Sequence, residues 1–234
     1  MSQLIKTSVV GFPRIGEKRE LKKALEEFWS GKTDINKLIE VSKELKKRHW
    51  CCQKEAGIDL ISSNDFSWYD QMLDTAVMLG AIPERFIPIA DDAEKYFAMA
   101  RGNKDNAAME MTKWFNTNYH YIVPELSKDD NYKLNAKKVI NEYLEAKELG
   151  IRTKINIIGP ITFLSLSKRV DDGNDTLELF DKLLPVYEAL ISEISLLDKE
   201  VFVQFEEPIF VKDVSKRMLY LLKTAYDRLP AVSN

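Results

Sequence analysis

The chain has 234 residues, of which 45% are hydrophobic and 30% are charged, a composition typical of globular proteins and not of disordered or collagen-like ones. Its formal net charge of −3 excludes a global positive field that would attract nucleic acid or an anionic membrane surface. The two cysteines, Cys51 and Cys52, are adjacent, which excludes a disulfide scaffold and favours a reducing, cytoplasmic location. We expect no leader segment and no membrane span, because no apolar run approaches the required length.

Strand-like and helix-like segments alternate along the chain. Runs rich in β-branched and aromatic residues predict strands at residues 8–12, 58–63, 119–124, 153–158 and 201–205. Helical spacing of apolar residues predicts helices at residues 18–30, 34–56, 69–79, 135–149, 176–197 and 214–228, with one or two more within 91–115. Thr33 and Asp34 offer an N-cap for the second of these helices, and Gly80 ends the third. Such alternation requires a parallel sheet with helices on its faces, so the predicted class is α/β.

Polar residues follow several predicted strands directly, as Arg14, Asp65, Glu125 and the Glu206-Glu207 pair do. In (β/α) barrels the carboxyl ends of the strands carry the chemistry, so this pattern favours a barrel. A complete eight-strand barrel takes about 250 residues, whereas this chain uses 234 for five strands and their long helices. The prediction is an incomplete (β/α)8 TIM-type barrel, about the first five strands with their helices, as one domain over residues 1–234.

A basic run occupies residues 14–23, at the start of a predicted helix. Cations there oppose the helix macrodipole, and Arg19 and Lys22, three residues apart, lie on one face and repel each other. Free backbone N–H groups at a helix start also favour an anion. An acidic ligand would relieve this arrangement, and the alternative is a solvated charged face that nearby glutamates partly offset.

Two other groups could carry chemistry. His49, Cys51 and Cys52 are capable of binding metal, but His49 and Cys52 fall on the apolar stripe of a helix, which favours core packing over zinc. Glu206 and Glu207 could serve as an acid/base pair, although neighbours on a strand point to opposite faces. The polar and aromatic residues 109–121 read as a loop feeding a strand, with structure and function both open.

Several long motifs occur in a recognisable order: GFPRIG at 11–16 with RELK at 19–22, SNDFS at 63–67 with YDQ at 69–71, and MTKWFNTNYHY at 111–121. Together they closely resemble the amino-terminal barrel of the cobalamin-independent methionine synthase family, over essentially the whole chain. That family has two face-to-face (β/α) barrels and transfers a methyl group from 5-methyltetrahydropteroyl-polyglutamate to homocysteine. Its chains are roughly three times as long as this one.

The resemblance implies a folate-binding site in this chain. The positions that match the family's folate contacts are Arg19, Glu20, Leu21, Lys22, Lys113 and Asn118. The basic residues among them suit the polyglutamate tail. Zinc and homocysteine belong to the family's second barrel, so we expect no cofactor, no metal and no catalytic residue here. Glu206 stands where the family usually has Asp, a conservative change.

We therefore expect the folate-binding part of a methyltransferase of methionine biosynthesis, inactive by itself. Two alternatives remain open: a stand-alone, non-catalytic binding or interaction module, and an unrelated barrel enzyme that uses Glu206 and Glu207. Cutting a closed barrel would leave open strand edges at residues 8–12 and 201–205, so self-association through these edges is also expected.

Overall fold

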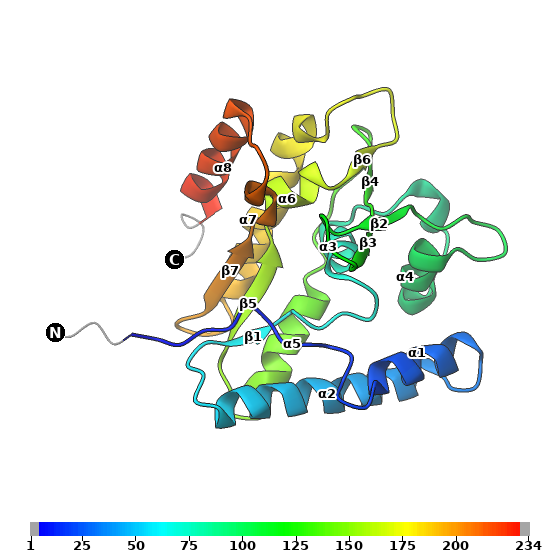
Figure 1. The fold of residues 1–234 in the computed structure, drawn as a ribbon. Helices are drawn as coiled ribbons and strands as arrows, with labels where there is room; N and C mark the ends of the chain where they lie inside the picture. The colour runs from blue at the N-terminus through cyan, green and yellow to red at the C-terminus, as the bar shows by residue number, and fades with distance from the viewer. Residues whose placement is uncertain (1–4, 230–234) are drawn as a thin grey trace. The chain divides into compact units, whose positions relative to one another are not determined.

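The computed structural model describes residues 5–229, which adopt a mixed α/β fold (Figure 1). Two compact units can be distinguished within the chain. Unit 1 comprises Met1–Trp68, Val139–Asn156 and Phe202–Gln204, and unit 2 comprises Tyr69–Lys138, Ile157–Val201 and Phe205–Asn234. Helices and strands alternate along the chain, which confirms the predicted α/β class.

In unit 1, helix α1 (Glu20–Trp29) packs alongside α2 (Ile35–Glu55) (Figure 1). As predicted, α2 begins at an N-cap, Asp34, whose carboxylate accepts the N–H of Lys37 at 3.0 Å. Amphipathic spacing places apolar side chains of both helices in one core. These buried residues are Leu21, Ala24, Leu25, Leu38 and Leu45.

The C-terminal half of α2 departs from the predicted apolar stripe. Cys52 is exposed, whereas Trp50 and Gln53 are buried. The Trp50 indole takes a core position and donates to the carbonyl of Ser62 at 3.0 Å. Gln53 accepts the N–H of Ser62 at 3.3 Å. The larger ring and the two bonds to the neighbouring strand explain why the buried face turns away from Cys52.

Strands β1 (Ile61–Ser63), β5 (Thr153–Ile158) and β7 (Phe202–Glu206) form a three-stranded sheet in the order β1-β5-β7. β1 pairs in parallel with β5, and Ile61 lies opposite Thr153. All residues of β1 and β5 are buried, as in parallel sheets that are covered on both faces. These three strands fall where the sequence predicted them, with β1 shorter than expected. Helix α5 (Lys137–Glu148) precedes β5.

The first predicted strand, residues 8–12, is absent from the structure. Only Ser8 forms an isolated β-bridge. The carbonyl of Val9 is bonded to side chains of the sheet and not to a neighbouring strand. It accepts from Ser62 Oγ at 3.1 Å and from Lys154 Nζ at 2.6 Å. The open edge expected at this segment therefore has no basis, and the expected self-association through it loses its support.

In unit 2, the helix predicted at residues 69–79 is α3 (Gln71–Leu79), which has Asp70 as its N-cap and ends at Gly80 as predicted. Gly80 has a φ of 69°, and a Cβ there would lie 2.6 Å from the carbonyl oxygen of Lys133, so a side chain is excluded. Helix α4 (Asp92–Arg101) accounts for only part of the helical region predicted over 91–115.

The rest of that region and the next predicted strand form an antiparallel hairpin, β2 (Met111–Lys113) with β3 (His120–Ile122). The helical prediction for residues 111–115 is thus wrong, and β3 pairs with β2 and not with the parallel sheet. The N–H of Trp114 donates to Tyr119 O at 2.7 Å and closes the turn. This bond and the aromatic residues of the segment favour strand pairing over the helix-forming Met and Lys residues.

The remaining elements of unit 2 include short ones that have no detectable periodicity in the sequence. β4 (Glu125–Leu126) pairs in parallel with β6 (Lys168–Arg169). The other elements are η1 (Glu84–Phe86), α6 (Pro160–Ser165), η2 (Thr176–Leu179), α7 (Phe180–Ser195), η3 (Pro208–Val211) and α8 (Lys216–Arg228). Over residues 5–229, no helix combines the length and the apolarity needed to cross a membrane.

Candidate functional site

The first group of predicted folate residues, Arg19 to Lys22, forms the start of α1 in unit 1. Arg19 is the N-cap residue, with the left-handed backbone angles φ 60° and ψ 37°. Arg19 and Lys22 are exposed, whereas Leu21 is completely buried. Arg19 and Lys22 can therefore offer charge to a ligand, while the side chain of Leu21 can only pack.

Glu20 is engaged inside unit 1. Its carboxylate accepts a hydrogen bond from Arg48 Nη2 at 2.8 Å and another from the backbone N–H of Lys18 at 2.8 Å. The bond from Arg48, followed by bonds from backbone N–H groups, lowers the pKa of Glu20 to about 2. Glu20 thus ties the start of α1 to α2 and is ionised at neutral pH.

Two backbone N–H groups at the start of α1 are already hydrogen-bonded within unit 1. The N–H of Arg19 donates to Gly16 O at 3.0 Å, and the N–H of Leu21 donates to Ile15 O at 3.1 Å. Both groups are satisfied by the preceding turn, so these two N–H groups are not available to an anion. The exposed side chains of Arg19 and Lys22 remain available to one.

Two of the recognised motifs meet in unit 1. Asp65 accepts the N–H of Phe12 at 2.7 Å, and Arg14 donates to the carbonyl of Ser67 at 3.0 Å. A Cβ at Gly11 would lie 3.2 Å from the Asp65 carboxylate, which makes a small residue favourable there. Asp65 and Arg14, which the sequence placed at strand ends, therefore join the GFPR and SNDFS segments to each other.

The second group of predicted folate residues lies on the β2–β3 hairpin of unit 2. Lys113 ends β2 and stands opposite His120 on β3, and Asn118 lies in the turn between them. All three residues are exposed. His120 Nδ1 is 3.0 Å from Asn118 O. The structure thus places Lys113 and Asn118 on one hairpin and adds His120, which only the strand register reveals.

Aromatic side chains hold this hairpin turn. Trp114 makes edge-to-face contacts with Phe115 and Tyr121, with ring centroids 5.1 and 5.5 Å apart. The Tyr121 hydroxyl donates to Leu166 O at 3.0 Å, and the Lys212 ammonium lies 5.0 Å from the Phe115 ring centroid. The aromatic density of residues 109–121 therefore has a structural role, since it stiffens the hairpin that carries the exposed polar groups.

The Glu206-Glu207 pair does not form an open acid/base site. The Glu207 carboxylate accepts the N–H of Ile161 at 3.1 Å and that of Thr162 at 2.6 Å, and it accepts the Tyr226 hydroxyl at 3.2 Å. Burial raises the pKa of Glu207. Glu207 thus caps the start of α6, which leaves the unrelated barrel enzyme without its proposed carboxylate pair.

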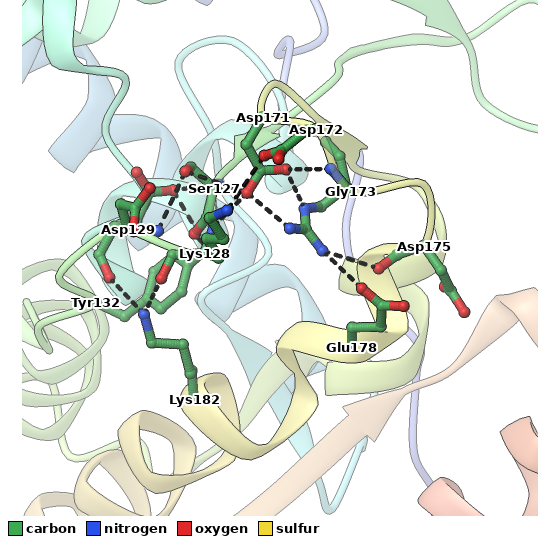
Figure 2. Close-up of polar contacts among 12 residues, drawn as sticks. Ser127, Lys128, Asp129, Tyr132, Asp171, Asp172, Gly173, Asp175, Glu178 and Lys182 are labelled. Carbon is green, nitrogen blue, oxygen red and sulfur yellow. Dashed lines mark hydrogen bonds and ion pairs between the residues drawn. The ribbon is translucent and has the colours of Figure 1, made fainter.

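A polar cluster that the sequence did not reveal joins the segments that follow β4 and β6 (Figure 2). Arg169 donates twice to Asp171, at 2.6 Å each, and once to Glu178 at 3.2 Å. Asp171 also accepts the N–H groups of Lys128 at 2.7 Å and Gly173 at 3.1 Å. The Arg169 guanidinium, followed by these N–H groups, holds the pKa of Asp171 well below its usual range. The cluster is therefore internally satisfied.

The residues described do not fit a zinc site. His49 is 7% exposed and stacks on Phe12 with ring centroids 4.6 Å apart, whereas Cys52 on the same helix is exposed. Over residues 5–229, no three His, Cys, Asp or Glu side chains gather in a way that could hold a metal ion.

Residues 6–234 match the family described as cobalamin-independent synthase, N-terminal domain. The chain belongs to this family. The family resemblance carried by the sequence motifs is thereby confirmed.

Curated relatives agree with this membership. The chain is 64% identical over 228 residues to a 5-methyltetrahydropteroyltriglutamate–homocysteine methyltransferase of Desulforamulus reducens, covering 97% of this chain and 30% of that protein. It is 43% identical over 232 residues to the protein of the same name from Flavobacterium johnsoniae, covering 96% and 30%. A chloroplastic form from Arabidopsis thaliana is 46% identical over 234 residues, covering 98% and 29%. The chain thus spans about 30% of the length of these relatives.

Proposed function

We propose that this chain is the amino-terminal, folate-binding part of a methyltransferase that moves a methyl group from 5-methyltetrahydropteroyl-polyglutamate to homocysteine in methionine biosynthesis. The observation that carries the proposal is the match of residues 6–234 to the N-terminal domain of the cobalamin-independent synthases. The curated relatives that span the chain carry this methyltransferase name. On this reading the chain acts in the cytoplasm and does not turn over substrate by itself.

The exposed basic side chains recognise the polyglutamate tail of the methyl donor. Each glutamate of a polyglutamate tail adds a carboxylate, to which Arg19 can donate in a bidentate manner and Lys22 and Lys113 as point charges. Asn118 adds an amide that can donate a neutral hydrogen bond. Exposure of these four side chains supports direct contact with ligand.

Glu20 and Leu21 have a different role in the proposal. Glu20 is occupied by Arg48 and would repel a carboxylate, and Leu21 is buried in the core between α1 and α2. We assign them to building the start of α1, so that Arg19 and Lys22 are held in place. Of the six residues that the resemblance marks, four would then touch the ligand and two would support them.

Homocysteine and zinc would be held by a second barrel that follows this part of the family's longer chains. Zinc, when bound there, would deprotonate a coordinated thiol and make it nucleophilic near neutral pH. The residues of this chain would bind and orient the methyl donor and would take no part in that deprotonation.

We also propose that residues 1–234 are one incomplete (β/α)8 barrel. The β1-β5-β7 order, the parallel β1–β5 pairing and the complete burial of both strands support this architecture. β7 has one neighbour among the residues described, so its other edge is expected to pair with a second copy when the chain is isolated. Light scattering over a concentration series tests this: a monodisperse monomer at all concentrations would contradict it.

The function is tested by calorimetric titration of the chain with the triglutamate and the monoglutamate of 5-methyltetrahydrofolate. The triglutamate should bind more tightly, and Lys22→Ala or Lys113→Ala should reduce that preference. Lys23→Ala and Lys104→Ala are matched controls, because each removes one exposed lysine from the same helix or the same unit. No binding, or equal affinity for the two ligands, would overturn the proposal.

A further inference from the structure

A buried carboxylate joins helix α3 to the hairpin of unit 2. Asp70 is 1% exposed. One of its oxygens accepts the N–H of Leu73 at 2.9 Å and caps α3. Its other oxygen accepts the N–H of Ile122, the last residue of β3, at 2.9 Å. A single side chain therefore fixes the start of the helix and the end of the strand.

The aromatic contacts hold the turn of the hairpin, and the bond from Ile122 to Asp70 supports its other end. Ile122 lies opposite Met111 in the register, yet its N–H is bonded to Asp70 and not to β2. Among the residues described, β2 and β3 form a sheet of two strands, and an isolated two-stranded hairpin is marginally stable in water. The Asp70 carboxylate takes the place that a carbonyl of a third strand would occupy. Figure 1 shows β3 beside α3, the helix that Asp70 caps.

The anchor itself is held firmly. The Tyr96 hydroxyl of α4 donates to Asp74 of α3 at 2.7 Å and accepts the N–H of Tyr69 at 3.1 Å. Lys138 pairs with Asp74 at 3.4 Å. The start of α3 is thus braced on both sides of Asp70, so the position of the carboxylate is determined by several elements of unit 2.

We propose that Asp70 is a positioning residue for the folate tail: it fixes the hairpin that carries Lys113 and Asn118, and so sets tail affinity without touching the ligand. This inference rests on the proposed function. A carboxylate suits this role better than an amide or a hydroxyl, because both of its oxygens accept and two N–H groups must be satisfied at once.

The substitution Asp70→Asn separates the two bonds. Asn caps helices about as well as Asp, so the bond to Leu73 is kept. The amide NH2 then faces the N–H of Ile122, so that bond is lost and a buried donor is left unsatisfied. Asp91→Asn is the matched control, because Asp91 caps α4 of the same unit by accepting the N–H of Glu94 at 2.7 Å.

Two measurements on the chain test the proposal. Hydrogen–deuterium exchange of residues 111–122 should be faster in D70N than in the unsubstituted chain and unchanged in D91N. Titration should show that D70N weakens triglutamate binding by about three- to thirtyfold, with a smaller loss for the monoglutamate, while D91N binds as the unsubstituted chain does. Asp70→Ser, which can cap α3 but is too short to reach β3, should repeat the result if D70N folds poorly.

The outcomes distinguish this inference from the proposed function. Faster hairpin exchange in D70N with unchanged triglutamate affinity would overturn the positioning role, provided that Lys113→Ala still weakens binding. Equal losses for the two ligands would also overturn it, since a general defect in folding would have that effect. If Lys22→Ala and Lys113→Ala change nothing, the folate-tail function itself is wrong.

Discussion

Two charged regions of the chain differ in how far their charges are already satisfied. At the start of α1, Arg19 and Lys22 are exposed, and the only ion pair described there for Lys22 is with Glu26 at 3.4 Å. In the cluster of unit 2 the Arg169 side chain is 6% exposed and is bonded to Asp171 and Glu178. The basic side chains at the start of α1 are therefore accessible to a ligand, whereas the Arg169 charge is already matched inside unit 2.

The two regions should also differ in what they contribute to stability. Exposed ion pairs typically add between nothing and about 1 kcal/mol, because water and salt screen them. Removing one partner of a largely buried pair is much more costly, since the other charge is left without compensation. The start of α1 can therefore be used for binding with little effect on folding, whereas the Arg169 cluster serves the fold.

The largest expected effect is the loss of stability on Arg169→Met. This change keeps the length of the side chain but strands Asp171, and we expect the melting temperature to fall by about 5–10 °C. Arg19→Met is the matched control and should shift the melting temperature by no more than about 2 °C. Thermal denaturation followed by circular dichroism measures both. Similar shifts for the two variants would contradict the expected difference in stability between the start of α1 and the Arg169 cluster.

The next effect concerns binding, and here the start of α1 should matter more than the Arg169 cluster. Lys22→Ala should weaken triglutamate binding by about ten- to hundredfold, the equivalent of one charge-assisted hydrogen bond. Arg169→Met, assayed below its melting temperature, should leave the ratio of triglutamate to monoglutamate affinity unchanged. If Arg169→Met alters that ratio as much as Lys22→Ala does, the Arg169 cluster also takes part in ligand recognition, which would contradict the expected difference between the two regions.

A third prediction uses pH, because a buried histidine lies beside the arginine that anchors the start of α1. Burial, followed by the charge of Arg48, lowers the pKa of His49 from 6.5 to about 4. The unfolded chain therefore takes up this proton first as the pH falls, and stability should decrease from about pH 6.5 to about pH 4.

Asp70 gives stability the opposite pH dependence over the same pH range, so the effect of His49 must be measured as a difference between two variants. Burial raises the pKa of Asp70 to about 7, and its contribution is lost as the pH rises toward that value. The melting temperature is measured as a function of pH for the unsubstituted chain and for His49→Gln. The difference between the two profiles gives the contribution of His49. An unchanged acid slope in His49→Gln would refute the assignment.

Local signals in the sequence were sufficient for most helices and for the α/β class. Asp34 and Gly80 mark helix ends by capping chemistry that acts within a few residues, which is why they could be predicted. The hairpin could not be predicted, because β2 has only three residues and Met and Lys favour helices in isolation. The strand expected at residues 8–12 failed because distant side chains such as Lys154 satisfy its backbone.

The candidate site divides in the same way. Exposed cations such as Lys22 and Lys113 could be named from motifs, since the residue type itself carries the chemistry. The supporting roles of Glu20 and Leu21 became visible only with their partners and their burial. Asp70 acts on β3 from a position 52 residues earlier in the sequence, and no pattern of spacing could have indicated that bond.

The smallest expected effect comes from Glu26→Gln, which removes the one described ionic partner of Lys22. Both side chains are about half exposed, at 47% and 56%, so the pair should contribute less than about 0.5 kcal/mol to folding. The melting temperature should therefore stay within about 2 °C of the unsubstituted value. Triglutamate affinity should rise slightly, by about twofold, because Lys22 no longer divides its charge between Glu26 and the tail. The double variant Lys22→Ala with Glu26→Gln should lose this gain, whereas a gain that persists without Lys22 would mean that Glu26 acts by general repulsion of the ligand.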